Sequence, residues 1–226
     1  MRISLVENVL KANDEIATAN RAMLRDAGVF AIDVIGAPGC GKTTLLEATL
    51  ARAQDLRVGV ICGDLATQRD AERLSRFGPQ VVQINTGKTC HLEAHHVQRA
   101  LRELDLFAID LLFIENVGNL ICPVGFDLGQ EAKVGVFSIT GGDDKAAKHP
   151  HLVTEADVLV LTQLDLLPYT RLDLPQFESD IARLCPAGKP LLRLSSITGE
   201  GLDAWCNWLR QHRNHYPLLR PCHQPI

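Results

Sequence analysis

The sequence lacks a surplus of basic residues. Among its 226 residues, 23 lysines and arginines stand against 27 aspartates and glutamates, which gives a formal net charge of −4. A protein dedicated to nucleic acid needs basic side chains to neutralise the phosphate backbone, so this balance argues against that class. Because 46% of the residues are hydrophobic and 22% are charged, the composition also excludes disorder over the whole chain. We expect a globular protein that does not bind nucleic acid.

Long apolar segments are missing as well. No run approaches the roughly 20 apolar residues that a membrane-spanning helix needs, so no membrane association is expected. The N-terminal stretch carries scattered acids and no apolar core before a small-residue cleavage site, which argues against a signal or transit peptide. We therefore expect a cytoplasmic protein built as a single domain over residues 1–226.

Cysteine is the residue whose number needs an explanation. The chain has seven cysteines, and an odd number without a secretory signal indicates reduced thiols rather than a disulfide framework. Cys62, Cys185 and Cys206 lie in apolar patterns and are predicted to be core residues. The others are available for other roles, including metal binding.

Short, nearly continuous apolar runs alternate with stretches of helical periodicity. Such runs are typical of strands buried on both faces of a parallel sheet. The seven predicted strands are 30–35, 58–62, 81–84, 110–115, 133–139, 157–162 and 190–194. The predicted helices are 3–27 (within an N-terminal helical segment 1–28), 43–53, 68–76, 90–104, 175–184 and 201–211, with a loosely held tail at 211–226. The alternation predicts an α/β fold with a doubly wound, mostly parallel sheet of about seven strands and helices on both faces.

A phosphate-binding loop is predicted directly after the first strand. The sequence GAPGCGKT at 36–43 matches G-x-x-x-x-G-K-[ST] in full and precedes a predicted helix. Glycines let backbone N–H groups turn toward phosphate oxygens, Lys42 supplies a positive charge, and the Thr43 hydroxyl ligates Mg²⁺. The residues predicted to hold the nucleotide phosphates are Gly36, Pro38, Gly39, Cys40, Gly41, Lys42, Thr43 and Thr44. Cys40 is interpreted as a small packed residue rather than a reactive thiol.

Carboxylates stand at the ends of two predicted strands on the same rim. Glu115 ends the fourth strand and Asp64 follows the second, so both are predicted to hold Mg²⁺ or to orient the attacking water. With Lys42, they are the predicted catalytic residues of a nucleotide hydrolase. A structural role at the strand end is the alternative for each acid.

Asp165 follows the sixth predicted strand, where guanine-binding loops carry the aspartate of Asn-Lys-x-Asp. A carboxylate in that place accepts hydrogen bonds from guanine N1–H and N2–H₂, whereas adenine N1 offers no donor. Ser195 and Ser196 follow the last strand and are predicted to provide the backbone contact to guanine O6. Gln163 replaces the lysine of the pattern, so guanine preference with weakened binding is expected. The alternative is that Asp165 merely caps the following segment.

Further segments carry a specific resemblance. They are QINTG at 83–87, CHL at 90–92, ENVGNLICP at 115–123 and FDLG at 126–129, and the likeness continues from NDEIA at 13–17 to TGEG at 198–201. The sequence resembles the HypB family of nickel-incorporation GTPases in [NiFe]-hydrogenase maturation. The resemblance implies a SIMIBI-like P-loop fold and a slow GTPase that uses GTP and Mg²⁺ and couples hydrolysis to nickel delivery. It also implies a homodimer, a HypA-like metallochaperone partner and the hydrogenase large subunit as client.

The resemblance also implies a site for Ni²⁺ or Zn²⁺ at Cys90, His91 and Cys122. Thiolate and imidazole ligands suit these ions and disfavour Mg²⁺. Thr89 is predicted to N-cap a helix that begins at Cys90, whose dipole would lower the pKa of the Cys90 thiol. Three ligands per chain are few, so a two-fold dimer that pools two sets is one arrangement. On spacing alone, a structural role for these residues is favoured.

Other histidines are given weaker roles. His95 and His96 follow on the same predicted helix and are expected to face solvent, with auxiliary metal binding as the alternative. Chance occurrence is preferred over metal contact for His149, His151, His212, His215, Cys222 and His223. The chain departs from many family members because no cysteine motif or histidine-rich stretch precedes the first helix, so nickel storage there is not expected. TGGDDKA at 140–146 also replaces the usual TEGEDKP.

Several functional classes stay open. The favoured class is a metal-responsive GTPase in which GTP and Mg²⁺ order the loops around Asp64 and Glu115, and Cys122 moves with the latter loop. A urease-type nickel GTPase is a close alternative. A P-loop ATPase or small-molecule kinase is a second alternative, although no acceptor lid or additional arginines near the phosphates are evident. A nucleotide-gated metal-binding protein with negligible turnover is the third.

Overall fold

One seven-stranded sheet forms the centre of the molecule. The structure is a computed structural model that describes residues 5–64, 69–87 and 89–215. The strand order is β3-β2-β4-β1-β5-β6-β7, and every neighbouring pair is parallel. The strands are β1 (Phe30–Gly36), β2 (Val58–Asp64), β3 (Gln80–Asn85), β4 (Leu111–Glu115), β5 (Ala132–Ser138), β6 (Val158–Thr162) and β7 (Leu191–Arg193). The seven predicted strands and the doubly wound parallel sheet are confirmed.

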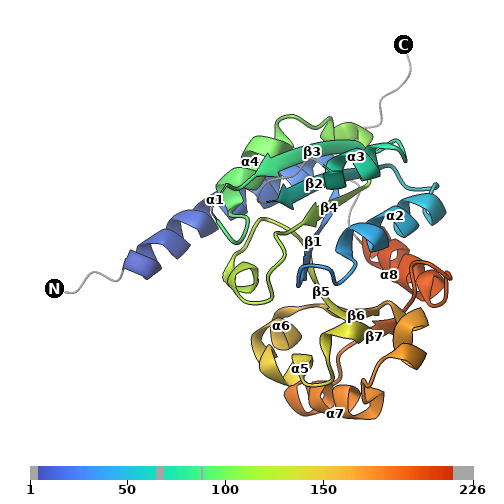
Figure 1. The fold of residues 1–226 in the computed structure, drawn as a ribbon. Helices are drawn as coiled ribbons and strands as arrows, with labels where there is room; N and C mark the ends of the chain where they lie inside the picture. Colours follow the sequence, from blue (N-terminus) through green and yellow to red (C-terminus); the bar gives the residue numbers. More distant parts are fainter. Residues whose placement is uncertain (1–4, 65–68, 88, 216–226) are drawn as a thin grey trace.

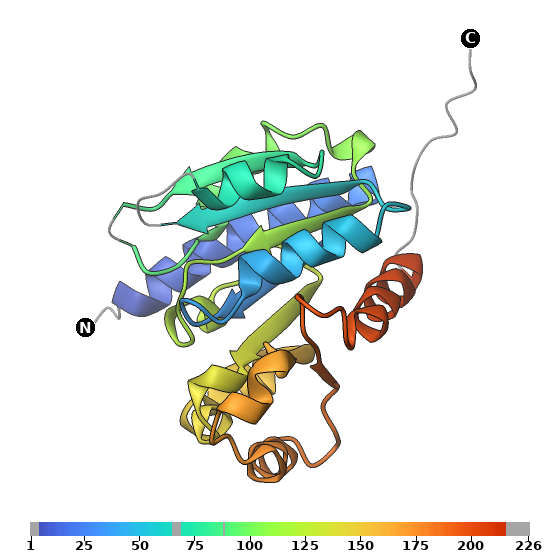
Figure 2. The same ribbon diagram turned by 45° about the vertical axis from the view of Figure 1, so that its right-hand side comes forward.

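Helices cover both faces of the sheet (Figure 1, Figure 2). The helices are α1 (Leu5–Ala27), α2 (Lys42–Arg52), α3 (Arg69–Ser75), α4 (Ala94–Leu101), α5 (Lys145–Lys148), α6 (Pro150–Glu155), α7 (Leu174–Leu184) and α8 (Leu202–His215). Side chains of α2, α3 and α8 share one core with the sheet, whereas α1 with α4 and α5 to α7 pack on the opposite face. None of the helices in the described ranges is long and apolar enough to cross a membrane.

The strand sequences are nearly continuous in apolar residues because both faces are covered. In β1, Ile32 and Val34 enter the core under α2 and α8, whereas Ala31 and Ile35 enter the cores on the other face. Burial also accounts for two of the three cysteines predicted for the core. Cys62 and Cys206 are buried, as predicted, while Cys185 is only half-buried.

The last helix is longer than predicted. α8 continues to His215, so residues 211–215 of the predicted tail are helical. The ring of His212 stacks on Trp208 with centroids 4.1 Å apart, and Arg213 donates to Asp110 at 2.9 Å, which holds these turns against the sheet. Residues 216–226, with Cys222 and His223, lie outside the described residues, as do residues 1–4 of the predicted N-terminal helix.

The helix predicted from Cys90 begins later than predicted. α4 starts at Ala94, and Glu93 is its N-cap. His96 Nδ1 accepts a hydrogen bond from the Glu93 N–H at 3.1 Å, which fixes the helix start at this point. The prediction that Thr89 caps a helix beginning at Cys90 is therefore wrong.

Candidate functional site

The predicted phosphate loop joins the end of β1 to the start of α2. Gly39 and Gly41 have φ angles of 74° and 87°, left-handed values that glycine adopts without strain. Lys42 Nζ donates to the carbonyl oxygens of Gly36 at 3.1 Å and Ala37 at 3.3 Å, so its ammonium group lies inside the curve of the loop. Cys40 is 3% exposed, in agreement with its interpretation as a packed residue.

Thr43 and Glu115, two predicted Mg²⁺ ligands, lie in contact. Thr43 Oγ1 donates to Glu115 Oε1 at 2.7 Å. Glu115 is buried, and its Oε2 has no hydrogen-bond partner among the described residues. Burial raises the pKa of Glu115 to about 7, although the Thr43 hydrogen bond and the charge of Lys42 act in the opposite direction. A hydroxyl beside a carboxylate with an unpartnered oxygen is a donor set of the kind that Mg²⁺ takes.

Asp64 is placed by its backbone only. β2 ends at Asp64, which pairs in register with Asn85 of β3, so the chain reaches the carboxyl edge of the sheet at this residue. Its side chain lies outside the described part of the structure. The predicted role of Asp64 stays a prediction.

A cavity of about 420 Å³ opens above the phosphate loop. Its lining consists of Pro38, Gly39, Gly41, Lys42, Thr43, Thr44, Gly63, Asp70, Arg73, Glu115, Asn116, Val117, Gly118 and Gln163. Asp70 and Arg73 come from α3 and were not predicted as site residues. The available signal was that α3 follows β2 at the carboxyl edge of the sheet, where ligands bind in this class of fold. Arg73 bridges α3 to α2 through Glu47, with the closest N–O distance 2.6 Å.

Asp165 and Ser195, two residues of the predicted base site, are hydrogen-bonded. Ser195 Oγ donates to Asp165 Oδ1 at 2.5 Å, and the same oxygen accepts from the backbone N–H groups of Ile197 and Thr198. The hydroxyl therefore fixes Asp165 against the turn that follows β7. Ser196 is half-buried in that turn.

Gln163 connects the predicted base site to the phosphate loop. Its Nε2 donates to the Gly39 carbonyl at 3.2 Å, and its Oε1 accepts from Thr140 Oγ1 at 3.1 Å and from Ser138 Oγ. Gln163 has a φ of 62°, a conformation that is uncommon for a residue other than glycine. These contacts hold it in the strained turn between β6 and the segment of Asp165.

Cys90, His91 and Cys122 come together from two separate segments. Cys90 and His91 lie in the bend before α4, and Cys122 begins a short 3₁₀ helix, Cys122–Gly125. One ligand atom from each residue lies within 4.8 Å of the others, a spacing that one metal ion can bridge. The ring of His91 packs on Phe126 with centroids 4.1 Å apart. Its buried Nε2 has no hydrogen-bond partner among the described residues.

The protonation of this cluster differs in part from the prediction. Burial lowers the pKa of His91, which favours the neutral imidazole that binds metal. The pKa of the Cys90 thiol is raised, first by its hydrogen bond with Cys122 and then by burial. The predicted lowering by a helix dipole is wrong, because α4 begins only at Ala94. A bound cation would favour the thiolate in place of the helix dipole.

The neighbouring histidines have other surroundings. His95 is exposed, as predicted, and its Nδ1 lies 3.3 Å from Glu93. His96, which was also predicted to face solvent, is half-buried, and its ring accepts the hydrogen bond at the start of α4. His149 precedes α6 as its N-cap, and burial lowers its pKa. None of these histidines is grouped with the Cys90, His91 and Cys122 cluster within the described ranges.

Asn116 connects the segment of Glu115 to the segment of the Cys90, His91 and Cys122 cluster. It follows Glu115 in the chain and is 1% exposed. Its Oδ1 accepts from the backbone N–H groups of Leu92 and Val117, both at 3.0 Å, and its Nδ2 donates to Asp33 at 3.1 Å. One side chain therefore holds both the segment after His91 and the segment after Glu115.

Comparison with known proteins gives consistent matches. Residues 30–191 match the model of the family described as CobW/HypB/UreG, nucleotide-binding domain. The probable hydrogenase maturation factor HypB of Methanocaldococcus jannaschii is 45% identical over 202 residues, covering 89% of this chain and 91% of that protein. The crystal structure of hydrogenase maturation factor HypB from Archaeoglobus fulgidus has a TM-score of 0.85 at 38% identity, covering 91% of this chain and 100% of that one. The structure of HypB from Helicobacter pylori in complex with nickel has a TM-score of 0.86 at 32% identity, covering 95% and 100%.

The buried carboxyl of Asp33 leads to a prediction about stability and pH. Burial is the main reason that its pKa is raised to about 7. Between about pH 4 and pH 7 the native state holds a proton that the unfolded chain has released, so stability falls as pH rises. Asp33→Asn keeps an acceptor for Asn116 and does not titrate. As the pH rises from about 4 to about 7, the unaltered chain should lose stability that Asp33→Asn keeps. The difference between their free energies of unfolding should therefore shift in favour of Asp33→Asn by up to about 4 kcal/mol.

Urea unfolding at a series of pH values measures this difference. Ile32→Val, in the same strand, should lower stability by an amount that does not depend on pH. Parallel pH profiles for Asp33→Asn and the unaltered chain would contradict the prediction.

Proposed function

The chain belongs to the CobW/HypB/UreG family, and from that premise we propose that it is a GTPase that handles nickel during hydrogenase maturation. Relatives that share most of its length are hydrogenase maturation factors, and a solved relative was crystallised with nickel. The P-loop fold of the family implies nucleotide hydrolysis. The observation that carries the proposal is the side chain of Asn116, which lies between the phosphate cavity and the segment of the metal cluster.

In the proposed hydrolysis, the residues of the phosphate loop hold the nucleotide in position. The backbone N–H groups of the loop and the α2 N-terminus face the phosphates, and Lys42 neutralises charge on the β- and γ-phosphates. When bound, Mg²⁺ would offset the negative charge that develops on the transferred phosphoryl group. Thr43 and Glu115 would hold this ion, and Asp64 would complete its surroundings or orient the attacking water.

Replacement of Lys42 tests the phosphate site. Lys42→Ala should lower GTP turnover by about 10²-fold or more and weaken nucleotide binding, because it removes a charge that is aimed at the phosphates. The fold should persist, since the hydrogen bonds of Lys42 Nζ to described residues are made to two loop carbonyls and not to the core. Phosphate release and circular dichroism measure the two effects. Lys148→Ala, which removes an exposed lysine on α5, is the matched control, and unchanged turnover in folded Lys42→Ala would contradict the proposal.

Guanine preference is assigned to Asp165. Its carboxylate is held by Ser195 and would accept the N1–H and N2–H₂ groups of guanine. Gln163 supports this region from the side of the phosphate loop. A carboxylate at this position would favour GTP over ATP, since adenine has no donor at N1.

Asp165→Asn tests this assignment. The amide nitrogen of the variant should face the N–H donors of guanine, so GTP should bind more weakly than to the unaltered chain, by about tenfold or more. XTP has a carbonyl at C2 that accepts from this amide, so it should bind the variant better than it binds the unaltered chain. Calorimetry with GTP, XTP and ATP measures the three affinities. Asp173→Asn, at the N-cap of α7, provides a control of identical chemistry. Equal affinities of the unaltered chain for ATP and GTP would mean that Asp165 does not recognise the base.

The nickel function is assigned to Cys90, His91 and Cys122. Two thiols and an imidazole form a soft to borderline donor set, which suits Ni²⁺ or Zn²⁺ and leaves Mg²⁺ to the oxygen donors of the phosphate site. A homodimer that joins two such sets would supply further ligands. A HypA-like metallochaperone and the hydrogenase large subunit are the proposed partners in delivery. Asn116 provides the link through which the bound nucleotide would alter the metal site.

Loss of either thiol should weaken the metal-binding event assigned to this cluster. Cys90→Ala or Cys122→Ala should weaken Ni²⁺ and Zn²⁺ binding by at least about tenfold, and affinity in the unaltered chain should fall with falling pH because the ligands must lose protons. Competition with a chromophoric chelator measures the affinity, with Cys185→Ala as the matched control.

The same titration tests the coupling of the two sites. Affinities measured with a GTP analogue and with GDP should differ by about fivefold or more. Identical values would leave a GTPase with a metal site but without a switch between them.

A further inference from the structure

The metal cluster is formed by two loops that the sheet does not hold together directly. Cys90 and His91 precede α4, and Cys122 begins the 3₁₀ helix that leads into the loop before β5. Near the ligands, the two segments are in contact through the packing of His91 on Phe126 and through the hydrogen bond that Asn116 Oδ1 accepts from the Leu92 N–H. A ligand set of this kind keeps its geometry only if something fixes the distance between the two backbones.

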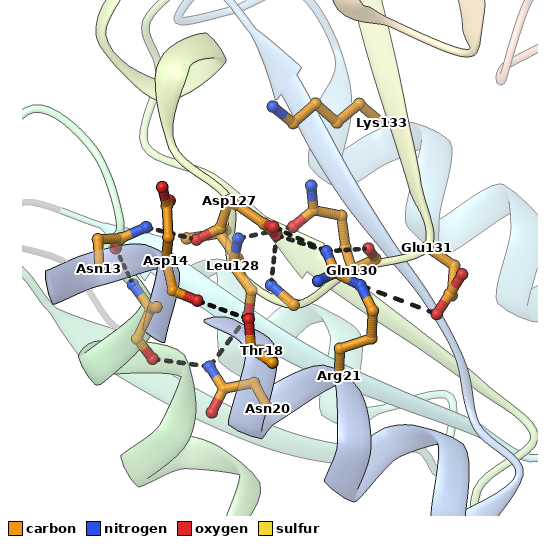
Figure 3. Close-up of polar contacts among 12 residues, drawn as sticks. Asn13, Asp14, Thr18, Asn20, Arg21, Asp127, Leu128, Gln130, Glu131 and Lys133 are labelled. Carbon is orange, nitrogen blue, oxygen red and sulfur yellow. Dashed lines mark hydrogen bonds and ion pairs between the residues drawn. The ribbon is translucent and has the colours of Figure 1, made fainter. Parts of the chain in front are cut away.

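Two asparagines of α1 make this connection (Figure 3). Asn13 Oδ1 accepts from the Ala94 N–H at 2.8 Å, and its Nδ2 donates to the Asp127 carbonyl at 2.7 Å. Asn20 Nδ2 donates to the Ala94 carbonyl at 2.8 Å and to the Leu128 carbonyl at 3.0 Å. Each asparagine therefore binds the backbone that follows His91 and the backbone that follows Cys122.

The asparagines lie on one face of α1, two helical turns apart, and they are 5% and 0% exposed. Arg21 strengthens the attachment, because its Nη2 lies 2.8 Å from each carboxylate oxygen of Asp127. The loop approaches the helix so closely that a Cβ on Gly129 would lie 2.6 Å from Asn20 Cβ. Backbone, rather than mobile side-chain ends, is thus held against α1.

We propose that Asn13 and Asn20 are positioning residues of the metal site, which set the separation of the loops that carry its ligands. The proposal rests on the function proposed above, in which the Cys90, His91 and Cys122 cluster binds Ni²⁺ or Zn²⁺. Apolar residues would join α1 to the sheet at lower cost in desolvation, because Asn20 Oδ1 is buried without a hydrogen-bond partner among the described residues. Asn13 and Asn20 together make four hydrogen bonds to the two ligand loops, and these bonds explain why amide side chains stand at the two positions.

The test measures metal affinity and stability in the same variants. Asn13→Ala and Asn20→Ala should each weaken Ni²⁺ affinity by about tenfold or more, the range seen when groups that orient metal ligands are removed. GTP affinity should stay within about twofold, since neither residue lines the phosphate cavity. Thr18→Ala, on the same helix, is the matched control, because the hydrogen bond that Thr18 makes in the described ranges is to Asp14 within α1. Ile181→Val, in the core under α7, controls for a general loss of stability.

The outcomes separate this inference from the proposed function. Asparagine variants that are less stable but bind Ni²⁺ as tightly as the unaltered chain would overturn the positioning role and leave the metal site in place. Absence of Ni²⁺ and Zn²⁺ binding by the unaltered chain would contradict the site itself, and the inference with it. If an asparagine variant does not fold, Arg21→Ala is used instead, because Arg21 also joins α1 to Asp127 and is more exposed than the asparagines. Unchanged Ni²⁺ affinity in Arg21→Ala would then count against the proposal, and a loss of about threefold would support it.

Discussion

The site depends on the pairing of β1 between β4 and β5. Val34 of β1 lies in register with Glu115 of β4, and Gly36 lies in register with Val136 of β5. All the strands run in the same direction, so the loop after β1 and the acid that ends β4 arrive at the same edge. The contact between Thr43 and Glu115 follows from this register. A slip by one residue would turn every β1 side chain to the opposite face and remove the acid from the loop.

Behind that edge, polar groups are buried where an ordinary sheet would bury apolar ones. Asp33 lies inside β1 with 0% exposure, and Asn116 beside it is 1% exposed. Asn116 uses both lone-pair directions of its oxygen for backbone N–H groups and its nitrogen for Asp33, which leaves its orientation little freedom. Burying these polar groups costs desolvation energy. We therefore infer that the network serves to fix the positions of the segments it joins rather than to stabilise the fold. Leu92 is held as a result, and with it the segment of His91.

The sequence predicted most accurately those features that are local. Strand positions followed from continuous apolar runs, and the phosphate loop followed from a motif whose residues are neighbours in the chain. The predicted helix start at Cys90 was wrong because Thr89 is a preferred N-cap residue type and glutamate is not, whereas the hydrogen bond from the Glu93 N–H to the His96 ring belongs to a helix that starts at Ala94. Asn13 and Asn20 were missed as site residues because their partners are remote. The bond from Asn13 to Asp127 spans 114 residues, and no periodicity encodes such a contact. The Cys90, His91 and Cys122 cluster is intermediate, since its two segments were brought together in the prediction only through a family resemblance.

The two halves of the site therefore differ in what holds them. The phosphate loop is fixed by strands on either side, whereas the ligand loops are fixed by asparagines at some distance from the ligands. In the proposed switch, the halves meet at Asn116, and a movement of Val117 that accompanied a change of nucleotide would alter the position of Leu92. Linkage then requires the converse, so that a metal that favours one position of His91 also favours the nucleotide that produces it. Metal would favour the nucleotide state in which the ligand atoms of Cys90, His91 and Cys122 lie closer together. In that switch the α1 asparagines would limit how far Leu92 can move, because they bind the backbone of Ala94 two residues further along the chain.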